Sequence, residues 1–224
     1  MKKKYEDCKE QWNTIFKKGA VTVPQVRETG NKTFDAALDW LCEDTERILD
    51  FGCGSGSVLF YCALRGTRKH IGIDMSEEGI GLAMKRKEMM KCGEYLFLDG
   101  STERLKGWND NSIDAVVLSN VIDNMYPDDA KELLEEIRRI LRPDGKALIK
   151  VNPYLSKKQQ LELNISEISG NLLDDGMLLW NNTTEEWKRL FHQYFTSVQY
   201  KDVYYREYDM HNRMFLARKE EEQE

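Results

Sequence analysis

The stretch from Ile48 to Val58, with the sequence ILDFGCGSGSV, restricts the fold more than any other part of the chain. Its β-prone residues run into a turn with glycine at every second position, and apolar residues follow. This pattern is typical of a buried parallel strand that passes into a helix at a ligand site. Glycine tolerates positive φ and lets a ligand lie against the backbone, while the first N–H groups of the helix point toward it. The sequence therefore predicts a ligand with a polar, extended portion at residues 52–56.

The spacing of these glycines distinguishes between two kinds of ligand. The dinucleotide-binding pattern G-x-G-x-x-G would place its third glycine at position 57, where this chain has Ser57. Asp50, two residues before the first glycine, would repel a pyrophosphate and attract an ammonium group. The loop therefore favours a ligand with an amino group over a dinucleotide. A tight turn with no chemical role is the alternative.

Composition limits the class of protein and its partners. A chain of 224 residues is long enough for one substantial α/β domain, and its net charge of −6 argues against a nucleic-acid partner. The basic start Met1–Lys4 precedes polar residues, and no apolar run reaches the length of a membrane span, so we expect a cytosolic protein with no membrane partner. The five cysteines are scattered without a C-x-x-C pair, which is typical of a reducing compartment and predicts no metal site.

Hydrophobic periodicity predicts alternating strands and helices. Two helices are expected within residues 1–45, and Trp12 of the first is expected to pack in the core. Strands are expected at residues 48–51, 70–74, 95–99, 113–120, 146–151, 197–206 and 210–218. We predict a Rossmann-like, doubly wound, mostly parallel seven-stranded sheet with an antiparallel edge hairpin, as a single domain over residues 1–219. Residues 220–224 are expected to form an acidic disordered tail.

The connection over residues 152–182 is too long for a plain connector. It predicts a small cap inserted after the fifth strand, at the same edge of the sheet as the glycine loop. A helix carrying Leu161, Ile165 and Ile168 and a short hairpin around Asp175-Gly176 are expected within it.

The segment from Leu49 to Gly56 resembles the first motif of the class I S-adenosylmethionine-dependent methyltransferases, and similar features extend over residues 47–151. The resemblance is to type 11-like small-molecule methyltransferases and implies S-adenosylmethionine as the cofactor. Helices that precede the first strand often pack over the cofactor in this family, and this position is the alternative to core packing for Trp12. The cofactor-binding residues that it implies are Asp50, Gly52, Cys53, Gly54, Asp74, Met75, Asp99, Gly100 and Asn120.

Three acidic residues follow different predicted strands and are expected to meet different parts of this cofactor. Asp50 would face the ammonium group, Asp74 the ribose hydroxyls, and Asp99 with Gly100 the adenine. A helix-start role is the alternative for Asp74, and for Cys53 the alternative is a small residue tolerated in a tight turn. We expect Asp74→Asn to be milder than Asp74→Ala.

Many members of this family carry a histidine near the position of Asp123, so its absence here argues against histidine-based catalysis. Asp123 and Tyr154 are the candidate catalytic residues, at a mouth beneath the cap that one or both of Tyr204 and Tyr205 would also line. Core packing is the alternative for these tyrosines, and for Asp123 the alternative is a cap on the turn before the helix expected from Asp128. The predicted reaction is in-line methyl transfer to a small molecule. A nicotinamide-dependent oxidoreductase and a non-catalytic module with the same fold are the alternatives, and the substrate and oligomeric state stay open.

Overall fold

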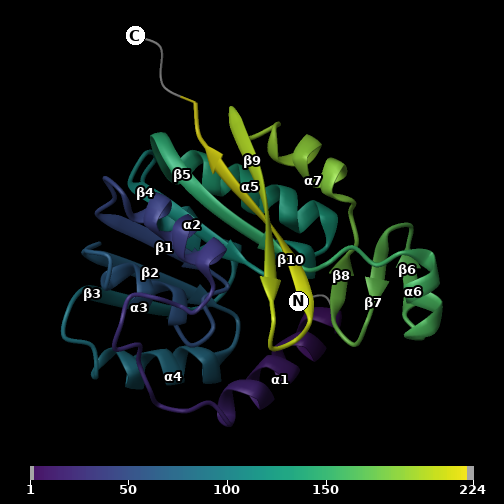
Figure 1. The fold of residues 1–224 in the computed structure, drawn as a ribbon, viewed down its shortest axis with the longest axis horizontal. Coiled ribbons are helices and arrows are strands. Elements are labelled where there is room, and N and C mark those ends of the chain that lie inside the picture. Colours follow the sequence, from purple (N-terminus) through teal and green to yellow (C-terminus); the bar gives the residue numbers. More distant parts are fainter. Residues whose placement is uncertain (1–2, 221–224) are drawn as a thin grey trace.

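The computed structural model describes residues 3–220 and contains a seven-stranded sheet with helices on both faces (Figure 1). Its strands are β1 (Arg47–Phe51), β2 (Lys69–Asp74), β3 (Glu94–Asp99), β4 (Ile113–Ser119), β5 (Leu141–Val151), β9 (Ser197–Tyr205) and β10 (Met210–Arg218). Their order is β3-β2-β1-β4-β5-β10-β9, and every pair is parallel except the two that involve β10. This confirms the predicted sheet and its antiparallel edge. The strand order reverses between β1 and β4, where sheets of this kind bind ligands.

The helices divide between the two faces of the sheet. The helices α2 (Lys32–Cys42), α3 (Ser57–Ala63) and α4 (Glu77–Lys87) contribute to one apolar core, while α5 (Pro127–Ile140) and α7 (Thr184–Phe191) contribute to the other. Two short 3-10 helices, η1 (Thr102–Gly107) and η2 (Ile122–Asn124), follow β3 and β4. Helix α1 (Lys3–Lys17) packs against α4 and runs along the edge of the molecule below the sheet in Figure 1.

Local signals account for where several of these helices begin and end. Pro127 starts α5. The first turn of this helix carries acidic side chains and the last turn carries arginines, an arrangement that the helix dipole favours. A capping box of Thr183 and Glu186 starts α7. Strand β5 begins at Leu141, five residues before the strand expected at residues 146–151, and the added residues include Asp144 with φ 57° and a shift in the register with β4.

The cap contains α6 (Lys157–Glu162) and a separate antiparallel sheet of β6 (Ser166–Ser169), β7 (Leu172–Asp174) and β8 (Leu178–Trp180). The hairpin expected around residues 175–176 is confirmed. The prediction of a helix that continues to Ile168 is wrong. Helix α6 ends at Glu162, because Asn164 adopts a left-handed φ of 53° and the Ile165 N–H donates to the Gln160 carbonyl. The apolar spacing was misleading, since the Leu161 side chain is 80% exposed.

The inner strands of the cap belong to the main core. Leu172, Leu178 and Trp180 are buried in the cluster that α5 and α7 build, and the Trp180 ring meets that of Trp187 at 5.0 Å. The cap is an insertion in the sequence, but its inner strands pack against the rest of the domain. Of the predicted acidic tail, residues 221–224 lie outside the described part of the chain. Within residues 3–220, every helix is too short or too polar to cross a membrane.

Candidate active site

The glycine loop between β1 and α3 is fastened to the end of β2 by its own backbone. The N–H groups of Gly52 and Cys53 donate to the Ile73 carbonyl at 2.7 and 3.1 Å. The Gly54 N–H donates to Asp74 Oδ2 at 2.7 Å, and the Ser76 N–H donates to Asp74 Oδ1 at the same distance. Asp74 therefore connects the glycine loop to the start of α4 with both of its carboxylate oxygens.

Two glycines of this loop are required by close contacts as well as by their backbone. Gly52 has φ 78°, and a Cβ there would lie 2.8 Å from the Val121 side chain. Gly54 has φ 50°, and a Cβ there would lie 2.6 Å from the ring of Phe16. A ring of α1 thus occupies the space beside Gly54 that we had expected a ligand to fill.

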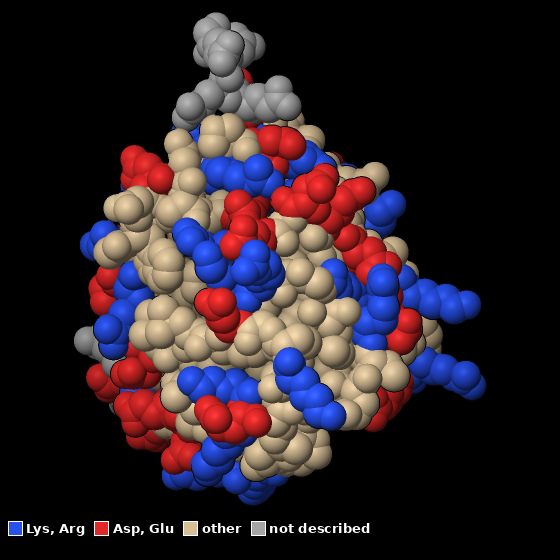
Figure 2. Space-filling model, turned by 90° about the vertical axis from the view of Figure 1, so that its left-hand side faces the viewer, with Lys and Arg blue, Asp and Glu red and all other residues tan. Residues whose placement is uncertain are grey.

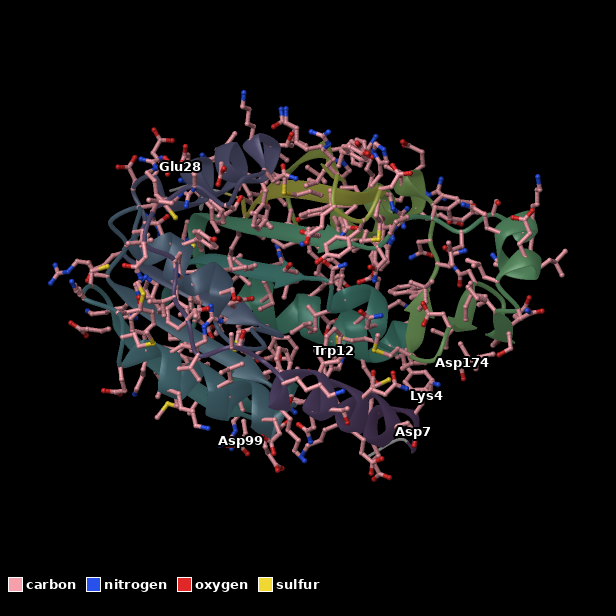
Figure 3. The ribbon with its side chains drawn as sticks, turned by 60° about the horizontal axis from the view of Figure 1, so that its bottom comes forward. Lys4, Asp7, Trp12, Glu28, Asp99 and Asp174 are labelled. Carbon is pink, nitrogen blue, oxygen red and sulfur yellow. The ribbon has the colours of Figure 1, made fainter. Side chains whose placement is uncertain are left out.

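A cavity of about 490 Å³ extends from the glycine loop beneath α1. This volume is within the usual range of small-molecule sites, about 300–1,000 Å³. Helix α1 turns Tyr5, Cys8, Trp12 and Phe16 toward it, and Figure 3 shows Trp12 pointing from α1 into the molecule. The other lining residues come from the ends of β1 to β4, from η1, η2 and α5, and from the cap: Phe51, Gly52, Gly54, Ile73, Asp74, Met75, Gly100, Ser101, Thr102, Glu103, Lys106, Ser119, Asn120, Val121, Asn124, Met125, Asp129, Glu132 and Met177.

The structure brings six of the predicted cofactor-binding residues to this cavity, namely Gly52, Gly54, Asp74, Met75, Gly100 and Asn120. Asp50 and Cys53 are buried and do not line it. The Asp99 side chain is 63% exposed, forms a 3.7 Å ion pair with Arg104, and lies outside the lining. Figure 3 shows Asp99 at the outer edge of the molecule. The binding roles of all nine residues stay predictions.

Asp50 lies behind the glycine loop in an unusual state for a carboxylate. It is buried, and its Oδ1 has no hydrogen-bond partner within residues 3–220. Burial, reinforced by the charge of Asp74 and opposed by that of Lys150, raises the pKa of Asp50 to about 8. The cavity does not reach Asp50, so the predicted contact between Asp50 and a ligand ammonium group would require the glycine loop to move.

Asp123 is also buried and does not line the cavity. Its Oδ2 accepts a hydrogen bond from the Asn152 N–H at 2.7 Å, so it ties the segment after β4 to the end of β5. Burial raises the pKa of Asp123 to about 6, against the opposing effect of that hydrogen bond. Nearby, Asn120 has φ 57°, donates its side-chain amide to Asn152 Oδ1 at 2.8 Å, and accepts from Asn212 at 3.2 Å.

The predicted mouth of tyrosines does not form at the cavity. Tyr154 is exposed and outside the lining. Tyr204 is exposed and donates to Asp209 at 2.9 Å, while the Tyr205 hydroxyl accepts from Lys150 Nζ at 3.1 Å. Sequence reasoning placed these residues at the correct edge of the sheet but on β9 and a cap segment that face other neighbours.

The lining residues that sequence reasoning missed lie mainly on α1. We expected Trp12 to pack in the core, but it is half-buried, lines the cavity, and stacks on Phe16 at 5.8 Å between ring centroids. The spacing of Tyr5, Cys8, Trp12 and Phe16 marks one face of a helix, and this is the signal that could have found them. Periodicity shows that such a face is turned inward, but not whether its side chains pack in a core or line a cavity.

Both ends of α1 are held in place over the cavity. At its start, Lys4 Nζ lies 2.7 Å from Asp174 Oδ1 of the cap, and Gln11 donates to the Gly176 carbonyl at 2.8 Å. Figure 3 labels Lys4 on α1 and Asp174 on the cap. Further along, Asn13 Oδ1 accepts from the Ser76 hydroxyl at 2.7 Å at the start of α4. Helix α1 therefore bridges the cap and the β2–α4 junction and closes the cavity between them.

Comparison with known proteins agrees with this architecture. A family model described as a methyltransferase domain matches residues 49–149, which run from the glycine loop to β5. Residues 49–149 therefore match a methyltransferase domain, and the chain is similar to the class I S-adenosylmethionine-dependent methyltransferases. This similarity favours a methyltransferase over a nicotinamide-dependent oxidoreductase, and it implies S-adenosylmethionine as the cofactor.

Among curated relatives, a tRNA N(3)-methylcytidine methyltransferase of Schizosaccharomyces pombe is 23% identical over 84% of this chain and 64% of its own length. A phosphoethanolamine N-methyltransferase of Arabidopsis thaliana is 28% identical over 62% of this chain and 27% of its own length. The chain thus spans less than two thirds of either relative.

Among solved structures, a 1,6-didemethyltoxoflavin N1-methyltransferase of Burkholderia thailandensis with bound S-adenosylhomocysteine superposes with a TM-score of 0.67. The two chains are 20% identical, and the match covers 97% of this chain and 89% of the other. A likeness at this level of identity shows the fold alone. The cavity of this methyltransferase domain fits the family's cofactor, because it joins positive-φ glycines without side chains to a buried carboxylate at the end of the neighbouring strand.

Proposed function

We propose that this methyltransferase transfers the methyl group of S-adenosylmethionine to a small-molecule acceptor bound in the same cavity. One observation carries the proposal. A single cavity of about 490 Å³ joins the glycine loop and Asp74 to side chains of α1, α5 and the cap. A cofactor on the loop and an acceptor beneath α1 would therefore share one covered space.

Each part of the cofactor site has a proposed task. The backbone of Gly52 and Gly54 would lie along the amino-acid portion of the cofactor, and Asp74 would accept hydrogen bonds from the ribose. Each Asp74 oxygen accepts one backbone N–H and retains a further lone pair for this purpose. Asp99 and Gly100 would meet the adenine at the exposed rim.

When bound, the cofactor supplies an electrophilic methyl group on its sulfonium. The chain's contribution is to orient the two reactants and to exclude water, which is a large part of the rate of such a displacement. Helix α1 provides the exclusion, because its aromatic side chains cover the cavity from the glycine loop to the cap. Asp123 and Tyr154 lie outside the cavity, so we assign Asp123 to holding the ends of β4 and β5 together and no proton transfer to either residue.

Charge supports a small molecule over tRNA as the acceptor. The chain has a net charge of −6, and on the face shown in Figure 2 basic and acidic side chains are interspersed rather than gathered into a basic area. A polyanion would find little long-range attraction on such a surface. A cytosolic location stays an expectation from the sequence.

The test supplies S-adenosylmethionine with an isotopically labelled methyl group, together with either the small-molecule fraction of a cell extract or total tRNA. We expect label in the small-molecule fraction, with S-adenosylhomocysteine formed in equal amount, and we expect calorimetry to show binding of S-adenosylmethionine but not NADH. Label found in tRNA alone would overturn the proposed acceptor. Binding of the cofactor without transfer to either fraction would favour the non-catalytic module.

A further inference from the structure

A buried arginine outside the cavity, Arg86 in the last turn of α4, holds the glycine loop from behind. Its Nη1 donates to the Ser55 carbonyl at 2.7 Å, to the Ser55 hydroxyl at 2.7 Å and to the Ser57 hydroxyl at 2.9 Å. Its Nε donates at 2.6 Å to the Thr22 carbonyl, in the segment between α1 and α2. One side chain therefore connects the glycine loop, the start of α3 and the segment that follows α1.

The positive charge of Arg86 is paired only with neutral groups. Within residues 3–220, its hydrogen-bond acceptors are all carbonyl or hydroxyl oxygens, and no carboxylate opposes the lowering of its pKa by burial. The guanidinium carbon also lies 5.0 Å from the centroid of the Phe60 ring. Arginine keeps its proton in folded proteins, so this group is a buried cation. A buried cation without a negative partner is costly, and negative charge brought near it is therefore favoured.

Little backbone separates this charge from the cavity. Ser55 directly follows Gly54, and Gly54 lines the cavity. Consecutive Cα atoms are about 3.8 Å apart, so one residue of backbone and one hydrogen bond lie between the guanidinium and the cavity wall. Charges interact more strongly across protein than across the same distance of water. The amino-acid portion of the cofactor, which we place along Gly52 and Gly54, carries a carboxylate that would lie within this range.

We propose that Arg86 is a positioning residue for this carboxylate, because its guanidinium supplies positive charge to the amino-acid end of the cofactor across the turn of residues 55–57. The inference rests on the proposed function, which places the cofactor on this loop. It makes Arg86 sensitive to whether a ligand carries a carboxylate. A purely structural role would instead weaken every ligand of the loop alike.

The experiment compares two ligands that differ in one group: S-adenosylhomocysteine and its decarboxylated analogue, which keeps the adenosine, the thioether and the amine. Calorimetry gives both dissociation constants, and the readout is the preference, defined as the constant of the analogue divided by that of S-adenosylhomocysteine. The wild type should prefer S-adenosylhomocysteine. Arg86→Gln removes the charge but keeps an amide donor, and it should lower the preference about tenfold.

Arg86→Lys retains the charge without the planar guanidinium. It should keep the preference within about threefold of the wild type, while both ligands bind more weakly because the loop is held less firmly. Lys85→Gln is the matched control, because Lys85 is the adjacent residue on α4, it is exposed, and the substitution removes the same charge. This control should keep the wild-type preference. Urea unfolding verifies that each variant is folded.

The outcomes are distinguishable. Failure of the wild type to bind S-adenosylhomocysteine would refute the proposed function itself. With that binding intact, four results would each overturn the inference alone: equal binding of both ligands by the wild type, an unchanged preference in Arg86→Gln, a loss in Arg86→Lys as large as in Arg86→Gln, or an equal loss in Lys85→Gln. The first result needs no variant, so the inference can be refuted even where a substitution at Arg86 prevents folding.

Discussion

Replacement of Asp74 by asparagine tests how the glycine loop is held. Both Asp74 oxygens accept from backbone N–H groups at 2.7 Å, one from Gly54 and one from Ser76. Asparagine offers one acceptor and one NH₂ donor, so one of these backbone N–H groups would face another donor. The geometry therefore changes our sequence-based expectation, and Asp74→Asn should be about as damaging as Asp74→Ala.

The magnitude follows from the lost hydrogen bond and the stranded donor. A hydrogen bond to a charged group contributes about 1.5–3 kcal/mol, and a buried donor left without a partner costs about 1–3 kcal/mol. Because these two contributions overlap, we expect the free energy of unfolding to fall by roughly 2–4 kcal/mol in Asp74→Asn. The loop would move with its anchor, so the dissociation constant of S-adenosylhomocysteine should rise at least about tenfold.

Urea unfolding followed by tryptophan fluorescence gives the first quantity, and calorimetry gives the second. Asp99→Asn is the matched control, because Asp99 is the register partner of Asp74 on β3 and its side chain is 63% exposed. Its stability should stay within about 0.5 kcal/mol of the wild type. The argument fails if Asp74→Asn unfolds and binds as the wild type does, or if it is clearly milder than Asp74→Ala.

Three further predictions concern other parts of the chain. Gly54→Ala should lower the free energy of unfolding by about 1–2 kcal/mol, because Gly54 has a positive φ. It should also weaken the binding of S-adenosylhomocysteine, because the new methyl group would displace Phe16. Gly81→Ala is the control: a Cβ there meets open space, so urea unfolding should show unchanged or higher stability. Burial lowers the pKa of His70 from 6.5 to about 4, so between pH 4 and 6.5 the unfolded chain binds more protons than the folded chain. The free energy of unfolding, measured relative to His70→Gln, should therefore rise by roughly 3 kcal/mol from pH 4 to 6.5. A difference that does not change with pH would contradict this. Met177→Ala should lower acceptor turnover and leave cofactor affinity nearly unchanged; unaltered turnover would show that the cap makes no contact with the acceptor.

The cap shows why a prediction made from connection length needed the structure. Replacing residues 156–180 by a flexible linker would be a direct test of a cap that is separate from the core. The structure places Leu172 and Leu178 in the main core, so that replacement would expose apolar surface and destabilise the whole domain. Met177 lines the cavity without belonging to that core, which makes it the sharper site for a substitution.

Local patterns in the sequence determined the order and type of most elements. The glycine loop, the capping box of Thr183 and Glu186, and the apolar stripe of α5 are signals that lie within a few residues of the structure they produce. The position of Asp74 at the end of β2 follows in the same way, because parallel strands present their carboxyl ends at one edge of the sheet.

Tertiary structure alone decided which side chains meet at that edge. Asp50 and Asp123 are sequestered by neighbours that are remote in sequence, and Tyr205 turns to Lys150 instead of the cavity. Tyr5 and Trp12 become lining residues because α1 is anchored at the cap and at α4. Periodicity indicates that a side chain has an apolar neighbour, but the identity of that neighbour depends on long-range packing. The part of the cavity that α1 covers could therefore be found only in the folded chain.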